Sequence, residues 1–197
     1  MIAGIILAGG ASSRMGSPKP LLRWGGETFL DRLIGVLGVV CNPVIAVLGY
    51  QAAEVAAGMA RTGEVTTVTN PNPEGGQLSS LQCGLRAVPA GCETVMFVPV
   101  DHPAVQRSTV EALARALTSG GAAIAIPRYQ GRRGHPVCVR RELADELLAL
   151  GPEGRASDVI HAHRAETVYI DTGDPGTVND IDDAEAYRRL TGRLGTP

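Results

Sequence analysis

The feature that most constrains the fold is a regular alternation of short apolar runs with segments of helical periodicity. The apolar runs are Ile2 to Ala8, Val44 to Leu48, Thr94 to Val100 and Ala122 to Ile126. Runs of this length are typical of parallel strands buried on both faces. Between them, apolar residues recur three or four positions apart, as in amphipathic helices. The alternation predicts a single α/β domain over residues 1–197, with a mostly parallel mixed sheet flanked by helices.

The sequence also predicts the structure of several shorter, less regular segments. Thr28 is expected to cap a helix that continues through Leu37. The turn-rich segment Asn70 to Ser80 is expected to be irregular until about Gln77, where a helix begins. Pro127 to Gly134 is predicted to be a cationic loop. The short strand Pro136 to Val139 is expected to run antiparallel, at or near an edge of the sheet.

Composition excludes several classes of function. A net charge of −2 and a pI near 6.1 argue against bulk nucleic-acid binding and against a polybasic membrane patch. The four cysteines form no CxxC pair, so a zinc site has little support and a reducing compartment fits. The first residues look like a strand rather than a secretory leader, and no apolar run approaches about 18 residues. We therefore expect a cytoplasmic protein without nucleic-acid or membrane partners.

The most unusual stretch is Leu7 to Leu22, LAGGASSRMGSPKPLL, directly after the first apolar run. It combines close-spaced glycines, serine hydroxyls, Arg14 and Lys19, the only lysine in the chain. Backbone N–H groups with two cations suit a polyphosphate. The spacing matches neither a Walker A loop nor GxGxxG. The alternative is a tight turn with a solvated Lys19.

Acidic residues supply the candidate metal ligands. Asp101 follows a fully apolar strand, which places it at the sheet edge where ligands bind in open α/β folds. Mg²⁺ prefers one or two carboxylates together with phosphate oxygens and waters. We assign Asp101 and Asp180 to Mg²⁺, and Asp182 or Asp183 to capping the last helix. Asp101 could instead cap the helix that follows it.

A second basic group lies in GRRGHPV. His135 follows Arg132 and Arg133 in a glycine-containing segment, an arrangement that could line a site for an anionic second substrate. We place these three residues with His102 in the group that binds the acceptor. A solvated loop with a structural histidine is an equal alternative.

The sequence resembles the MobA-like nucleotidyltransferases, a group that includes molybdenum cofactor guanylyltransferases and cytidylyltransferases. The resemblance rests on LAGGASSRMGSPKPLL, GGQLSSLQCGL, PVDHP, GHPV and VNDIDDAEAY, and it extends over essentially the whole chain. It implies a Rossmann-like domain of the glycosyltransferase-A type that binds an NTP and Mg²⁺. The implied nucleotide-binding residues are Leu7, Ala8, Gly9, Gly10, Ser12, Ser13, Arg14, Lys19, Gln77, Ser79 and Ser80.

The resemblance also implies an activity. A phosphate oxygen of the acceptor, molybdopterin in this family, would attack the α-phosphorus of the NTP, and pyrophosphate would leave. Arg14, Lys19 and Asp101 would be the catalytic residues. GQLSSLQCGL and GHPV favour CTP, whereas Gly9 resembles the guanylyltransferase branch. A molybdoenzyme or its chaperone would receive the product.

Two other functions fit the same residues. One is a sugar-phosphate nucleotidyltransferase, which would turn over with a hexose phosphate and not with molybdopterin. The other is a non-catalytic cofactor-delivery protein, which would release no pyrophosphate from any NTP. The combination of Arg14, Lys19 and Asp101 favours an enzyme.

Overall fold

In residues 1–12 and 16–192, which the computed structural model describes, eight strands form a central sheet. They are β1 (Ile2–Ala8), β4 (Val44–Leu48), β5 (Thr66–Thr69), β6 (Thr94–Pro99), β7 (Ile124–Tyr129), β8 (Arg132–Arg133), β9 (Val137–Arg140) and β10 (Thr167–Asp171). Their order is β10–β7–β9–β6–β1–β4–β5, with β8 paired to β7. The strands β2 (Arg23–Trp24) and β3 (Glu27–Thr28) form a separate antiparallel pair.

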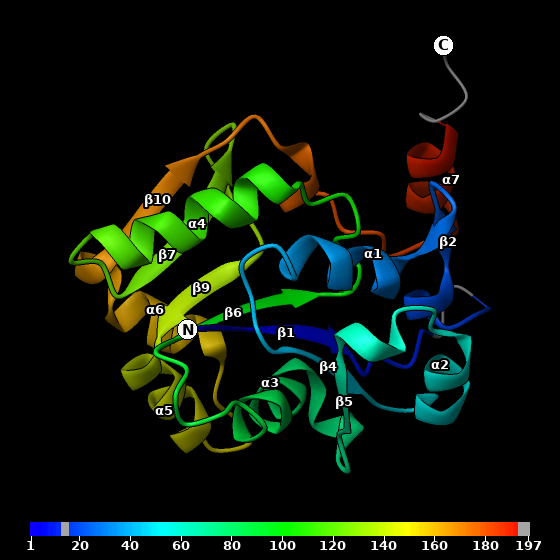
Figure 1. Cartoon of the computed structure of the whole chain (residues 1–197), viewed down its shortest axis with the longest axis horizontal. Coiled ribbons are helices and arrows are strands. Elements are labelled where there is room, and N and C mark those ends of the chain that lie inside the picture. Colours follow the sequence, from blue (N-terminus) through cyan, green and yellow to red (C-terminus); the bar gives the residue numbers. More distant parts are fainter. Residues whose placement is uncertain (13–15, 193–197) are drawn as a thin grey trace.

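Helices cover both faces of this sheet (Figure 1). They are α1 (Phe29–Leu37), α2 (Ala52–Gly58), α3 (Gly76–Arg86), α4 (Arg107–Ser119), α5 (Arg141–Ala149), α6 (Ala156–Ala162) and α7 (Ala184–Gly192). Side chains of α1, α2, α4 and α7 pack in one apolar core, and side chains of α3, α5 and α6 pack in the other. No helix in the described ranges is long and apolar enough to cross a membrane.

The central strand β1 shows why its sequence is apolar throughout. It pairs in parallel with β4 on one side and β6 on the other. Because side chains alternate along a strand, Ile6 packs in one core and Ile5 in the other. The single α/β domain with a mostly parallel mixed sheet is confirmed.

The antiparallel part of the sheet differs from the expectation in one respect. β9 runs antiparallel, as predicted, but it lies between β6 and β7 and is not at an edge. β10 closes this side of the sheet by pairing in parallel with β7. As an inner strand, β9 has an apolar core on each face: Cys138 packs in one core, and Val137 and Val139 pack in the other. All three side chains are therefore buried.

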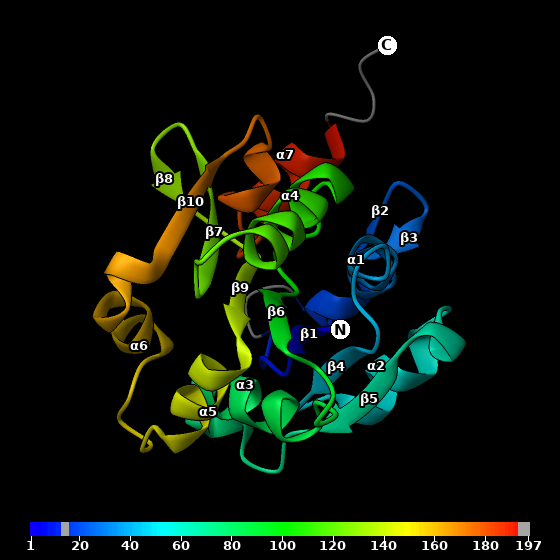
Figure 2. The ribbon, with the colours of Figure 1, turned by 60° about the vertical axis from the view of Figure 1, so that its left-hand side comes forward.

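The segment predicted as a cationic loop is a hairpin instead. β7 continues to Tyr129, and β8 pairs back with it through Arg132 and Arg133. Gln130 and Gly131 connect the strands, and both have positive φ, as two-residue hairpin turns require. Figure 2 shows β7, β8 and β10 together at one end of the sheet, with α2 and β5 at the other.

Helix capping follows the sequence closely. The Thr28 hydroxyl accepts a hydrogen bond from the Asp31 amide at 3.0 Å, which confirms it as the cap of α1. Before α7, the Asp183 carboxylate accepts from the Ala186 amide at 2.8 Å. Asp183 rather than Asp182 therefore makes the expected contact at the start of this helix.

Candidate active site

The chain segments that follow β1, β4 and β6 converge on one cavity. It has a volume of about 380 Å³ and lies at the carboxyl ends of these parallel strands. This is where ligands bind in open α/β sheets, and the volume is in the range of small-molecule sites. Its lining comprises Leu7, Ala8, Gly9, Gly10, Ala11, Ser12, Lys19, Pro20, Tyr50, Pro73, Gly76, Gln77, Ser80, Pro99, Val100, Asp101 and Asp182.

Close backbone packing beside this cavity requires glycine at two positions. A Cβ built on Gly49 would overlap the backbone of Gly9, so the chain after β4 can touch the loop after β1 only without a side chain there. A Cβ on Gly9 would lie 3.0 Å from the Ser80 hydroxyl oxygen. Backbone therefore forms this part of the wall, and the binding of a nucleotide by Gly9 and Gly10 stays a prediction.

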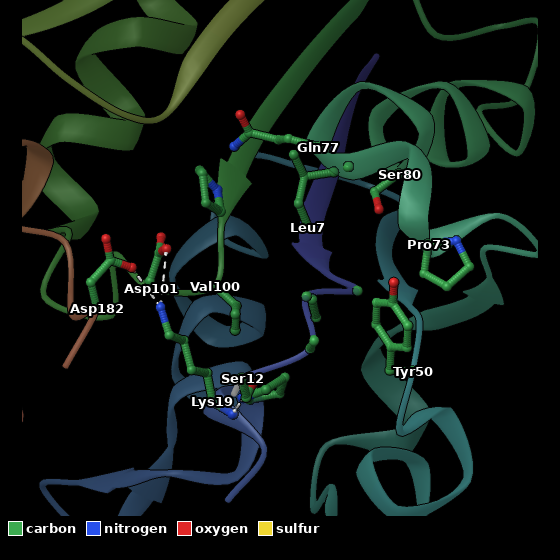
Figure 3. A pocket seen from close by; sticks show the side chains of 17 residues that line it. Leu7, Ser12, Lys19, Tyr50, Pro73, Gln77, Ser80, Val100, Asp101 and Asp182 are labelled. Atoms are coloured by element: carbon green, nitrogen blue, oxygen red, sulfur yellow. Dashed lines mark hydrogen bonds and ion pairs between the residues drawn. The ribbon is translucent and has the colours of Figure 1, made fainter. Parts of the chain in front are cut away.

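Lys19 lies at one end of the cavity, facing two carboxylates (Figure 3). Its Nζ is 2.6 Å from Asp182 Oδ1 and 3.8 Å from Asp101 Oδ2, and only 16% of its side chain is exposed. The Lys19 amide donates to the Ser12 hydroxyl at 2.8 Å, which closes the loop beneath the ammonium group. The alternative of a solvated Lys19 is therefore wrong.

Asp101 is the most buried acid of this cluster. Its Oδ1 is buried without a hydrogen-bond partner among the described residues. Burial raises the pKa of its carboxyl, while His102 and Lys19 lower it and Asp182 and Asp180 raise it further. Asp101 does not cap the next helix, because Gln106 precedes α4 and its amide donates to Asp174. Asp101 is thus oriented into the cavity.

Asp182 was missed by the sequence reasoning as a residue of the cavity. The Ile181 amide donates to the Asp101 carbonyl at 2.8 Å, which holds this segment beside β6. Asp182 then faces Lys19, whereas Asp180 lines two neighbouring cavities. From the sequence, Asp182 was considered only as a cap of the last helix, and no local pattern showed that its carboxylate meets Lys19.

The chemistry of the acids fits a divalent cation bound together with a phosphate. In residues 1–12 and 16–192, no three His, Cys, Asp or Glu side chains are grouped to hold a metal by themselves. One or two carboxylates are what Mg²⁺ uses when phosphate oxygens and waters complete its shell. The buried Asp101 Oδ1 accepts no hydrogen bond from the described residues and has only His102 Nε2 nearby, at 3.8 Å, so it is a suitable ligand atom. Asp180 as the second ligand stays a prediction.

The polar residues in the first turns of α3 have two different roles. Gln77 and Ser80 line the cavity. The Ser79 hydroxyl instead donates to the Asn72 carbonyl at 2.6 Å and accepts from Asn70 at 2.7 Å, which fixes the turn. Ser13 and Arg14, both assigned to the nucleotide and Arg14 also to catalysis, lie outside the described residues.

A second cavity of about 640 Å³ lies beside His102, the neighbour of Asp101. The rings of His102 and His135 are 4.9 Å apart, and Arg133 also lines this space. The Nδ1 atom of His135 is buried without a hydrogen-bond partner in the described part of the chain. Burial, and to a lesser extent His102, lowers the pKa of His135 to about 3. His135 is therefore neutral at physiological pH.

Arg132 is separated from the other residues of the predicted acceptor group. It lines a different cavity with Trp24 and Arg189. The cause is local: Arg132 and Arg133 are adjacent in β8, and successive side chains of a strand point to opposite faces. The structure brings together His102, Arg133 and His135 only.

A third cavity of about 460 Å³ adjoins the first two. It shares Leu7 and Gln77 with the glycine-lined cavity. It shares His135 and Ile160 with the histidine cavity. Its other lining residues include Leu78, Leu81 and Phe97, so this third cavity is largely apolar.

The chain is similar to known nucleotidyltransferases. The MobA-like NTP transferase domain matches residues 4–168. A molybdenum cofactor guanylyltransferase of Rhizobium meliloti is 36% identical over 83% of this chain and 71% of its own. The molybdenum cofactor cytidylyltransferase of Escherichia coli is 30% identical over 70% and 69%. A probable guanylyltransferase of Bacillus cytotoxicus is 29% identical over 67% of this chain, which spans 64% of that protein.

Solved structures show the same fold over nearly the whole length. The crystal structure of Rv0371c from Mycobacterium tuberculosis superposes with a TM-score of 0.82 at 27% identity, covering 97% of both chains. A crystal structure of Rv0371c in complex with manganese gives a TM-score of 0.77 at 27% identity, covering 97% of this chain and 98% of that one. On these matches, the chain belongs to the MobA-like NTP transferase family of nucleotidyltransferases.

Proposed function

We propose that the protein transfers CMP from CTP to a phosphate of a molybdopterin-type acceptor, with Mg²⁺, and releases pyrophosphate. GTP is the alternative donor. The product would pass to a molybdoenzyme or to its chaperone. The relatives named as molybdenum cofactor guanylyltransferases and cytidylyltransferases support the acceptor class and both donors.

The observation that carries this proposal is the charged end of the glycine-lined cavity. There the ammonium group of Lys19 lies within 4 Å of two carboxylates, those of Asp101 and Asp182. A triphosphate entering this end meets the Lys19 cation and the backbone N–H groups of the glycine loop. A metal that binds the triphosphate meets the two acids. Positioning and charge neutralisation are the main contributions that phosphoryl-type transfers need from a protein.

The metal would be held by Asp101 together with a carboxylate of the Asp180–Asp182 segment. Bound there, Mg²⁺ would neutralise charge on the triphosphate and polarise the phosphoryl oxygens. The position of Asp182 beside Lys19 supports it as this second carboxylate. The manganese complex of Rv0371c supports a divalent cation in this fold.

The acceptor would enter from the histidine cavity, on the other side of Asp101. Arg133 supplies a cation for its phosphate, and neutral His135 supplies a hydrogen bond without charge. The largely apolar third cavity, which adjoins both of the others, would hold an uncharged ring system of the acceptor. In this arrangement the acceptor phosphate and the α-phosphate of the nucleotide approach each other near Asp101.

A pyrophosphate-release screen tests the proposal. CTP and GTP are each supplied with Mg²⁺, alone, with a molybdopterin-type acceptor and with hexose phosphates. We expect release that requires the molybdopterin-type acceptor and is faster with CTP. Release driven by hexose phosphates would favour the sugar-phosphate reaction, and no release from either nucleotide would favour a delivery protein.

A further inference from the structure

The cavity has a second end whose chemistry differs from the charged end. Figure 3 shows Tyr50 and Pro73 side by side on the wall away from Lys19, Asp101 and Asp182. Both residues line the same cavity as the charged cluster. The backbone of Gly9 and Gly10 also lines this cavity. The cavity is therefore polarised along its length, with cation and acids at one end and an aromatic ring at the other.

The Tyr50 side chain is largely exposed and is not packed into either apolar core. Its exposed fraction is 54%, and it is the only aromatic among the large hydrophobic side chains exposed in residues 1–12 and 16–192. Within those residues its hydroxyl has no hydrogen-bond partner. An exposed ring at a cavity wall leaves a flat apolar face open to a ligand.

The backbone on both sides holds this wall in place. The contact between Gly49 and Gly9 fixes the chain immediately before Tyr50, and the Ala52 amide donates to the Gly49 carbonyl at 3.1 Å. Beside Tyr50, the turn that carries Pro73 is held by Asn70, whose side-chain oxygen accepts from the Asn72 amide at 3.0 Å. The wall is thus preorganised, which lowers the entropy lost on binding.

We infer that Tyr50 and Pro73 form the nucleobase wall of the site, with the Tyr50 ring stacked on the base. This inference rests on the proposed nucleotidyl transfer and gives the nucleotide its orientation, with the triphosphate toward Lys19 and the base toward Tyr50. Stacking is tolerant of base identity because every base has a π face. Tyr50 therefore supports the affinity for CTP and GTP alike, and the polar groups of Gln77 and the nearby backbone are left to discriminate between them.

The test compares ligands with and without a base. Dissociation constants of CTP, GTP and inorganic tripolyphosphate, each with Mg²⁺, are measured by calorimetry for the wild type and variants. Loss of base–aromatic stacking predicts that Tyr50→Ala raises the Kd of both nucleotides about tenfold. The same variant should bind tripolyphosphate as the wild type does, because that ligand has no base. Lys19→Ala should weaken all three ligands.

Two further variants make the result specific. Tyr50→Phe keeps the ring and should recover most of the nucleotide affinity. Tyr129→Ala removes an aromatic ring outside the cavities described above and serves as the matched control. An unchanged nucleotide Kd for Tyr50→Ala, an equal loss for tripolyphosphate, or no recovery in Tyr50→Phe would each overturn the inference.

The failure of this inference and the failure of the proposed function are distinguishable. Pyrophosphate release by the wild type with an acceptor tests the reaction and does not depend on Tyr50. Wild-type release together with unchanged nucleotide affinity in Tyr50→Ala overturns only the base wall. Weakened nucleotide binding in Tyr50→Ala without any wild-type release supports the wall and overturns the reaction.

Discussion

Lys19→Ala is the most informative single substitution, because Lys19 is the only lysine and contacts both acids of the charged cluster. Two unit charges about 4 Å apart near a protein surface interact by roughly 4 kcal/mol. Only the part of this interaction that grows as charge develops in the transition state speeds the reaction. Loss of one such donor typically costs about 3 kcal/mol. We therefore expect kcat to fall by roughly 10²–10³.

The same substitution should leave the fold largely intact. The Asp182 side chain of the ion pair is 47% exposed, and partly exposed pairs contribute about 0–1 kcal/mol to stability. Thermal unfolding should therefore shift by only a few degrees. The assay is pyrophosphate release with CTP, Mg²⁺ and acceptor, and Arg115→Ala is the control because Arg115 is exposed on α4. Turnover within a factor of two or three of the wild type would refute the role of Lys19.

Three other predictions concern the metal, the neutral histidine and the glycine contact. Asp101→Asn should abolish Mg²⁺-dependent turnover while the protein stays folded; metal-independent activity would contradict the carboxylate role. Because burial lowers the pKa of His135 to about 3, the unfolded chain binds its proton first as the pH falls. Stability should drop between about pH 6.5 and pH 3, by about 3 kcal/mol at pH 4, and denaturant titration of His135→Phe should show a smaller drop than the wild type. Gly49→Ala should weaken CTP binding and lower Tm, because its methyl group overlaps the Gly9 backbone; wild-type Kd and Tm would refute the steric reading.

The architecture could be predicted where local pattern decides it. The apolar run Ile2 to Ala8 is β1, and Thr28 caps α1, because burial on two faces and a free helix N-terminus each leave a mark in the nearby sequence. The central position of β9 could not be predicted. Which strands pair is decided by long-range contacts, and Val137 to Val139 would look the same at an edge.

The meeting of the loops at one edge of the sheet could be predicted from the sequence, but the contacts of individual side chains could not. Lys19 and Asp101 meet because the ends of adjacent parallel strands lie at one edge of the sheet. The separation of Arg132 from Arg133 depended on recognising the hairpin at Gln130-Gly131, whose turn signal was present in the sequence. Tyr50 carried only a weak signal, an aromatic directly after a strand, and its place in the cavity depends on the contact between Gly49 and Gly9.

The most direct test of the central claim follows the α-phosphate itself. CTP radiolabelled at the α-phosphate is incubated with Mg²⁺, a molybdopterin-type acceptor, and either the wild type or Asp101→Asn. The account predicts that the label moves into the acceptor with one pyrophosphate released per transfer, and that Asp101→Asn transfers none. Label that stays in CTP, or leaves as free CMP without reaching the acceptor, would contradict the claim that this cavity performs nucleotidyl transfer.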